Sequence, residues 1–235
     1  MRAAAELREL IQPTSLAVER LLPVLPPLSP LLAAGGLACG STIRVEGARS
    51  LALALVAGAS AAGSWTAVVG TGSVGWSAAA DLGIDLARTF VIPDVALGDW
   101  SEVTAAVVDA VDVVMVSPQY PVRERDARRL SARARERGTV IVVVDARFGW
   151  PLAPDVTFEA SGRWSGMGEG HGRLQARRLS VVASGRRAAA RARQLDLWLP
   201  AADGSVRSVL DQVQADPAEP TESPDDMVVV MPAAG

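Results

Sequence analysis

Short apolar runs alternate with helical segments through the middle of the chain. Buried strands that alternate with helices predict an α/β fold, in which a mostly parallel sheet has helices on both faces. The expected strands are 41–46, 65–69, 89–92, 111–116 and 139–144, and the expected helices are 49–62, 74–83, 99–109 and 123–137.

The pattern changes near Trp150, where longer segments replace the short apolar runs. The sequences DVTFEASGRW and RLQARRLSVVASG predict two longer strands on either side of a glycine-rich turn at 166–172, and QLDLWLP predicts one more short strand. We therefore expect an antiparallel C-terminal extension at one edge of the parallel sheet.

Both ends of the chain differ in composition from this core. Residues 1–30 combine a short helix with a proline-rich, irregular arm, and residues 31–200 form the expected core domain. Residues 201–235 are expected to be an acidic, largely disordered tail, with seven acidic residues against Arg207 in a chain of net charge −3. The apolar run Met227–Met231 in this tail predicts docking, either on the protein's own sheet or on a partner.

The composition excludes several kinds of chemistry. The sequence contains no lysine, so all 23 basic residues are arginine. Cys39 is the only cysteine, which excludes an intrachain disulfide and a thiolate metal cluster. His171 is the only histidine and stands between two glycines, so a Ser-His-Asp triad is not expected. No metal or cofactor is expected. The stretch between Arg49 and Asp81 is uncharged, but glycines divide it into a helix and a strand, which favours a buried βαβ unit over a membrane span.

The stretch STIRVEGARSLALALVAGAS predicts a strand, a tight turn and a helix. A nucleotide-binding loop at such a turn has the pattern G-x-x-x-x-G-K-[ST], with a lysine on the phosphates. Here the turn is shorter, and Arg49 or Ser50 stands where the lysine and hydroxyl would be. Arginine does not replace lysine in a tight phosphate nest. We therefore interpret Gly47, Arg49 and Ser50 as a vestigial phosphate loop.

The order of motifs over residues 31–145 resembles a RecA-fold ATPase. The matching segments are LLAAGGLACGSTIRVEG, SLALAL, ADLGIDLARTFVIPD and VDVVMVSP. The resemblance implies a RecA-like core whose Walker B strand ends at Ser117, where the family has an aspartate for Mg²⁺. It also implies that Gly72 stands in the place of the catalytic glutamate. Together with the short loop, these losses predict a protein that does not hydrolyse ATP and is not an enzyme.

A closer resemblance, over residues 20–200, is to actinobacterial ImuA-type proteins. It is carried by VEGARSLALAL, AAGSWTAVVG, DARRLSARARERG, GHGRLQARRLSVVASGR and LDLWLP. The resemblance implies a cytoplasmic accessory protein of DNA-damage-induced translesion synthesis, associated with the nucleoid when engaged. It implies two partners, an ImuB-type Y-family polymerase-like protein and an error-prone C-family polymerase. A SulA-like cell-division inhibitor, with a degenerate RecA-like fold, is a related alternative.

A second motif favours a different class of protein. The sequence VVGTGSVG contains G-x-G-x-x-G at Gly70, Gly72 and Gly75, after an expected strand and before an expected helix. Asp94 closes the next strand, near the spacing at which a Rossmann enzyme binds the ribose of its dinucleotide. However, a complete strand and helix precede the motif, whereas this fingerprint usually opens its domain. Dinucleotide binding therefore remains an alternative.

Arginines are concentrated in the C-terminal extension, and between Arg163 and Arg193 only Glu169 opposes them. On the expected strand 173–183, Arg173, Gln175 and Arg177 should share one face, because side chains alternate along a strand. Such a cationic face can contact DNA phosphates, meet an acidic protein partner or remain solvated. The candidate DNA- or partner-binding residues are Arg163, Trp164, Arg173, Arg177, Arg178, Arg186 and Arg187. The arginines of the helix 123–137 are interpreted as a solvated surface.

Overall fold

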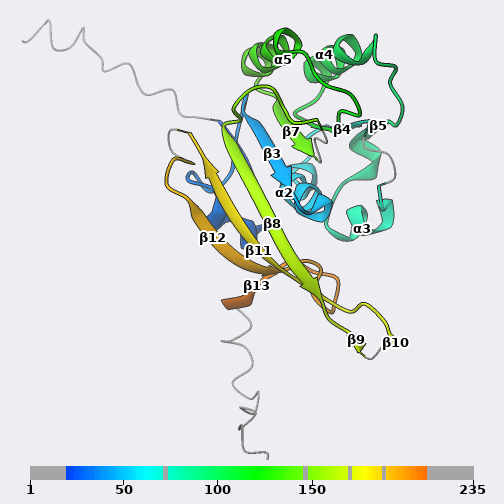
Figure 1. Ribbon diagram of the computed structural model, residues 1–235, viewed down its shortest axis with the longest axis vertical. Coiled ribbons are helices and arrows are strands. Elements are labelled where there is room, and N and C mark those ends of the chain that lie inside the picture. The colour runs from blue at the N-terminus through cyan, green and yellow to red at the C-terminus, as the bar shows by residue number, and fades with distance from the viewer. Residues whose placement is uncertain (1–19, 71–73, 145–147, 169–170, 187–188, 211–235) are drawn as a thin grey trace, which may run out of the picture.

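The computed structural model describes residues 20–70, 74–144, 148–168, 171–186 and 189–210 (Figure 1). Its main feature is a nine-stranded sheet with the strand order β13-β12-β11-β8-β3-β7-β6-β4-β5. The strands from β8 to β5 are mutually parallel, and β11, β12 and β13 continue from β8 in antiparallel pairing. The expected fold class is confirmed. The strand bounds are β3 Thr42–Glu46, β4 Thr66–Val69, β5 Thr89–Ile92, β6 Val113–Val116, β7 Val140–Val144, β8 Val156–Trp164, β11 Arg177–Gly185, β12 Arg193–Trp198 and β13 Arg207–Ser208.

Helices cover both faces of the parallel part of the sheet. The described helices are α2 (Arg49–Ala61), α3 (Trp76–Asp81), α4 (Trp100–Ala110) and α5 (Glu124–Arg137), with the 3-10 helices η1 (Pro26–Leu31) and η2 (Leu86–Arg88). One buried cluster joins α2 and α3 to the sheet, and a second joins α4 and α5 to its other face. Strand β7 contributes Val142 to the first cluster and Val143 to the second. Because β7 is buried on both sides, its sequence is apolar throughout.

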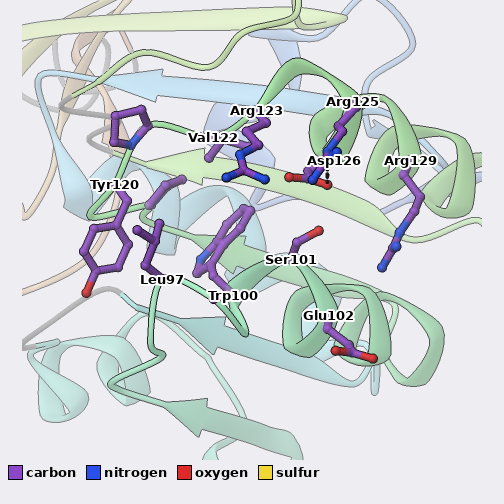
Figure 2. Close-up of a pocket in the computed structure, with 13 residues that line it drawn as sticks. Leu97, Trp100, Ser101, Glu102, Tyr120, Val122, Arg123, Arg125, Asp126 and Arg129 are labelled. Carbon is purple, nitrogen blue, oxygen red and sulfur yellow. Dashed lines mark ion pairs between the residues drawn. The ribbon is translucent and has the colours of Figure 1, made fainter.

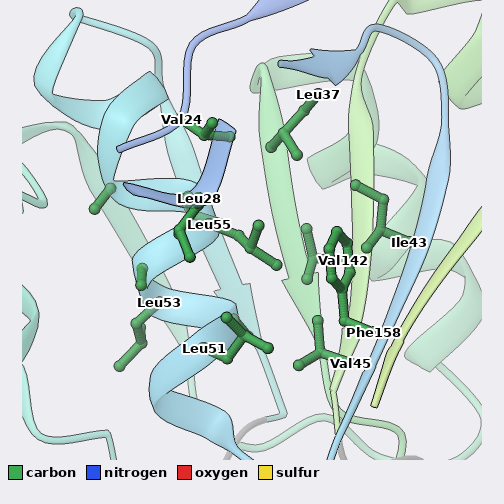
Figure 3. Close-up of a cluster of buried hydrophobic side chains, with 14 of the residues drawn as sticks. Val24, Leu28, Leu37, Ile43, Val45, Leu51, Leu53, Leu55, Val142 and Phe158 are labelled. Carbon is green, nitrogen blue, oxygen red and sulfur yellow. The ribbon is translucent and has the colours of Figure 1, made fainter. Parts of the chain in front are cut away.

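The segment before β3 packs on α2 and forms part of the core. Strand β1 (Leu21–Leu22) pairs antiparallel with β2 (Leu37–Ala38), and η1 lies between them in the chain. Val24 and Leu28 belong to the same buried cluster as the leucines of α2 (Figure 3). A Cβ atom at Gly58 of α2 would overlap the backbone of Val24, so the glycine permits this close approach. The sequence suggested an irregular arm here, but the structure forms β1 and η1, and Leu22, Leu28 and Leu31 are buried.

The antiparallel extension has one apolar and one polar face. Phe158, Leu179, Val181 and Leu197 are buried on the face that continues the α2 core. Helices α4 and α5 do not reach across the opposite face of β8, β11 and β12 (Figure 1). At the tip of the extension, β9 (Met167–Gly168) pairs with β10 (His171–Gly172). Because β13 pairs with β12, the sheet continues past residue 200.

Some expectations concern residues outside the described ranges. These include the N-terminal helix at 2–11, Gly72, Arg187 and the apolar run of the tail. In the part of the chain that is described, no helix combines the length and the apolar character needed to cross a bilayer. The uncharged stretch after Arg49 instead contains α2 and the buried strand β4.

Candidate functional site

The turn between β3 and α2 contains only two residues. Strand β3 ends at Glu46, and α2 begins at Arg49 after Gly47 and Ala48. Gly47 has a φ of 82°, and a Cβ atom there would overlap the carbonyl oxygen of Ala160 in β8. The turn is therefore packed against the neighbouring strand. Two residues provide fewer backbone N–H groups for a phosphate than the longer loop of a nucleotide-binding site.

Charge near this turn also disfavours a polyphosphate. Glu46 is the register partner of Glu159 in β8, so two carboxylates lie side by side at the end of β3. Arg44 forms an ion pair with Glu46, and Glu159 is exposed. The Oγ of Ser50 is buried and has no hydrogen-bond partner within the described part of the chain. An anion at the turn would lie beside these carboxylates, of which Glu46 is already paired with Arg44, and no lysine is available to bind it.

The end of β6 holds no carboxylate. Ser117 is 1% exposed, and its N–H donates a hydrogen bond of 3.1 Å to the carbonyl of Val69. Gln119 Nε2 donates to the carbonyl oxygens of Gly70 at 3.2 Å and Ser117 at 3.1 Å. Because β7 separates β3 from β6, Ser117 lies two strand spacings, about 10 Å, from the end of β3. Gln119 was not singled out from the sequence, and no local pattern marks it.

The structure describes two of the three motif glycines, Gly70 and Gly75, because Gly72 lies outside the described residues. Gly70 and Asp94 line one cavity of about 270 Å³ at the carboxyl ends of β4 and β6. The chain continues from these two adjacent strands to opposite faces of the sheet, a location where open α/β sheets bind ligands. Gly75 precedes α3, but α3 has only six residues. This short helix offers little support for a pyrophosphate.

The arginines of the extension fall on two faces of the sheet. In the β8–β11 register, Arg163 is opposite Arg178, and Trp164 is opposite Arg177. Side chains alternate along a strand, so the first pair lies on the polar face and the second on the other face. Arg178 Nη2 donates to Asp196 at 2.9 Å, which partly neutralises the polar face. The guanidinium carbon of Arg177 lies 5.9 Å from the ring centroid of Trp164.

The expected strand at 173–183 begins later than predicted. Strand β11 starts at Arg177, so the predicted alignment of Arg173, Gln175 and Arg177 on one strand face is wrong. The cause lies opposite, where Gly166 has a φ of 91° and a Cβ atom would overlap the carbonyl oxygen of Arg173. Ser165 pairs with two residues on the facing segment, donating to Ala176 and accepting from Gln175. The exposed Arg173 therefore lies beyond the regular ladder.

Arg186 lies at the far end of β11 from Arg177. Its Nη2 donates to Asp155 Oδ1 at 3.2 Å, and the Oδ2 of Asp155 accepts from the N–H of Thr42 at 2.9 Å. Arg186 thus helps to join the start of β3 to the end of β11. Among the described candidates, Arg186 is therefore separated from Arg163, Arg177 and Arg178.

A pocket between α4 and α5 was not predicted from the sequence. It has a volume of about 440 Å³ and lies between the first turns of α4 and α5 (Figure 2). One wall is apolar and aromatic, and the other is cationic. The apolar wall contains Leu97, Trp100, Tyr120 and Val122, and the cationic wall contains Arg123, Arg125 and Arg129. Arg125 lies 3.7 Å from Asp126.

Trp100 gives this pocket a buried polar group. The side chain is 7% exposed, and its Nε1 has no hydrogen-bond partner among the described residues. Apolar pockets with a few polar groups are the usual form of small-ligand and peptide sites. In the described ranges, no three histidine, cysteine, aspartate or glutamate side chains converge to hold a metal ion.

A known protein family matches the part of the chain that contains these features. The family model described as the MT3502 N-terminal domain matches residues 30–151. A Mycobacterium tuberculosis protein, described as uncharacterized protein Rv3395c, is 41% identical over 102 residues. That match covers 43% of this chain and 50% of the relative, so the chain spans about half the length of the curated protein it matches. The matched segment contains the short β3–α2 turn, Gln119 and the α4–α5 pocket. The chain belongs to the MT3502 N-terminal domain family.

Proposed function

We propose that this chain is a non-catalytic accessory protein whose RecA-like core serves as a scaffold for other proteins. The observation that carries this proposal is the two-residue turn between β3 and α2, where Gly47 lies against the backbone of β8. ATP hydrolysis on a P-loop needs a longer loop, a lysine and a metal-binding acid. The sequence has no lysine, and β6 is followed by Ser117 and Gln119 with no aspartate between them.

We further propose that the chain is an ImuA-type protein of damage-induced translesion synthesis and mutagenesis, part of the SOS response. The sequence motifs that resemble this group support the assignment. Its partners would then be an ImuB-type Y-family polymerase-like protein and an error-prone C-family polymerase. DNA is a further candidate ligand through the arginines of the extension. The protein would act in the cytoplasm and associate with the nucleoid when engaged.

Nucleotide binding tests the non-catalytic part of the proposal. Titration calorimetry with ATP and Mg²⁺ should detect no binding tighter than about millimolar. Steady-state assays should detect no phosphate release above a protein-free control. A micromolar dissociation constant would contradict the proposal, because it would mean that Arg49 and Ser50 hold phosphate without a lysine.

Co-purification from cells with DNA damage tests the assignment to translesion synthesis. The tagged full chain should recover the ImuB-type and C-family polymerase partners after DNA damage, as identified by mass spectrometry. The same tag on an unrelated protein provides the background. Recovery of metabolic dehydrogenases without either polymerase partner would count against the assignment.

Dinucleotide binding is a second candidate because Gly70 and Asp94 line the same cavity. Fluorescence titration with NADH and NADPH tests it, and Asp94→Ala provides the matched variant. Tight binding that the variant loses would favour an enzyme over a scaffold. The scaffold proposal predicts that neither the wild type nor Asp94→Ala binds NADH or NADPH saturably.

A further inference from the structure

The outer edge of the sheet at β5 carries an exposed apolar cluster. Trp65 and Phe90 stack with ring centroids 5.3 Å apart, although they are 41% and 50% exposed. The guanidinium carbon of Arg88 lies 5.9 Å from the Trp65 ring centroid. Val91 points to the other face of the strand and is 45% exposed. Exposed apolar clusters with a polar rim mark interaction surfaces.

The backbone of β5 is also available for pairing. Strand β5 pairs with β4, and no described strand lies on its outer side. Gly70 N–H donates to the Ile92 carbonyl at 2.9 Å, so the polar backbone groups of Ile92 face β4. Groups of successive residues face opposite sides, so those of Val91 face outward. Arg88 and Pro93 flank β5, but its own four residues, Thr-Phe-Val-Ile, contain neither the charge nor the proline that usually protects an edge.

We propose that two copies of this chain pair antiparallel through β5, with Val91 opposite Val91 of the second copy. The pairing is symmetric, so one strand edge serves both partners. It satisfies the outward N–H and C=O of Val91 with two hydrogen bonds across the axis. The neighbouring residues need no acceptor from the second copy. The Thr89 N–H already donates to the Leu86 carbonyl, and Pro93 has no backbone N–H.

Side chains near the axis complement one another in this register. Phe90 lies opposite Ile92 of the second copy, on the face that also holds Trp65. Continuing the register past Pro93 brings Arg88 opposite Asp94 of the second copy, and symmetry repeats this contact. Arg88 also donates to the Gly63 carbonyl at 2.7 Å and lies 3.7 Å from Asp85, so Asp94 would be an additional partner. Asp94 is exposed and has no ion pair within the described residues. A strand with a positive start and a negative end is thus complementary to an antiparallel copy of itself.

The protein's own tail would have to cross the whole sheet to reach this edge. The described chain ends at Leu210, just after β13, and β13 and β5 are the two opposite edges of the sheet. Eight strand spacings separate them, which is about 38 Å. A second copy presents the identical strand, so the Phe90–Ile92 contact is made twice by symmetry.

Sedimentation measures the dimer directly. The full-length chain should show a reversible monomer–dimer equilibrium at concentrations up to roughly 100 µM. Val91→Glu should raise the dimer dissociation constant at least about tenfold, because it places two like charges on the axis. Val91→Thr keeps the β-branched shape and the backbone donor, so it should dimerise like the wild type. A monomeric wild type, or equal dimerisation of Val91→Glu, would overturn the proposal.

Crosslinking measures the register. In a Cys39→Ser background, Val91→Cys should form a covalent dimer on mild oxidation, because directly opposite hydrogen-bonded residues have Cα atoms about 5.5 Å apart. Phe90→Cys is the matched control, since its two copies would lie on a diagonal about 8 Å apart, beyond disulfide reach. Crosslinking of Phe90→Cys at the same rate, or no crosslinking of Val91→Cys, would overturn the register.

Discussion

Arg133 Nε donates a hydrogen bond of 2.6 Å to Oδ1 of Asp109, and this contact ties α5 to α4. The same arginine donates to the second carboxylate oxygen, and Arg137 donates to Oδ1 at 3.2 Å. We expect Asp109→Asn to lower the melting temperature by about 2 °C, because the neutral amide cannot accept both charged donors. Glu102→Gln, also on α4, removes a carboxylate that has no ion pair among the described residues, so it should change the melting temperature less. Scanning fluorimetry measures both, and equal melting temperatures would contradict the expectation.

The same carboxylate predicts a dependence on pH. Hydrogen bonds from Arg133, with smaller contributions from Arg137, hold the pKa of Asp109 below its ordinary value. A carboxyl group whose pKa is lower in the folded state stabilises the fold above its unfolded pKa of about 3.9. This contribution is lost as pH falls through the lowered folded pKa. The difference between wild type and Asp109→Asn should therefore be constant near neutrality and disappear in acid.

A single methyl group added to the β3–α2 turn should strongly destabilise the fold. Gly47→Ala should cost more than about 2 kcal/mol of unfolding free energy, because the new Cβ overlaps the Ala160 carbonyl and φ is positive. Gly98→Ala is the control, since its Cβ would meet nothing within 4 Å. Urea denaturation measures both variants. A stable Gly47→Ala protein would mean that the turn is open enough to reconsider as a phosphate site.

A carboxylate at position 119, after the end of β6, should lower the stability of the fold. In Gln119→Glu, the carboxylate would face the carbonyl oxygens of Gly70 and Ser117, so we expect a loss of about 1 kcal/mol or more. Gln119→Met keeps the shape without the charge and should cost less. Chemical denaturation at neutral pH orders the two variants. The reverse order would show that repulsion from the carbonyls is unimportant.

The arginines at the tip of the extension test the proposed DNA contact. Arg173→Glu combined with Arg177→Glu should reduce the salt dependence of DNA affinity by about two units of slope. Arg186→Gln should keep the wild-type slope, because Arg186 lies at the other end of β11 beside Asp155. Fluorescence anisotropy over a range of salt concentrations measures these slopes. Unchanged slopes in the double variant would remove this surface from the DNA-binding proposal.

Most elements could be predicted because their signals are local. The helix expected at 49–62 is observed as Arg49–Ala61, and the strand at 89–92 has the expected bounds. Valine-rich runs and their flanking turns carry this information in consecutive residues. The strand start at Arg177 was missed because Gly166, on the facing segment, determines it.

The candidate sites were less predictable because they depend on contacts between distant segments. Gln119 acts at the carbonyl of Gly70, forty-nine positions away, and nothing near either residue indicates the pairing. The α4–α5 pocket joins Trp100 to Arg123 across a complete strand. The candidate arginines of the extension lie close together in the sequence. Side chains alternate along β8 and β11, however, so these arginines are divided between two faces of the sheet.

The uneven helical cover of the sheet has a consequence for hydrogen exchange. Strands β6 and β7 are buried on both faces, whereas β8, β11 and β12 present one polar face that neither α4 nor α5 crosses. Amide protons exchange through local openings whose free energy rises with the apolar contacts that must be broken. The central strands should therefore exchange only by global unfolding, while the extension should exchange through separate, smaller openings. Deuterium uptake should therefore appear in the extension well before it appears in β6 and β7.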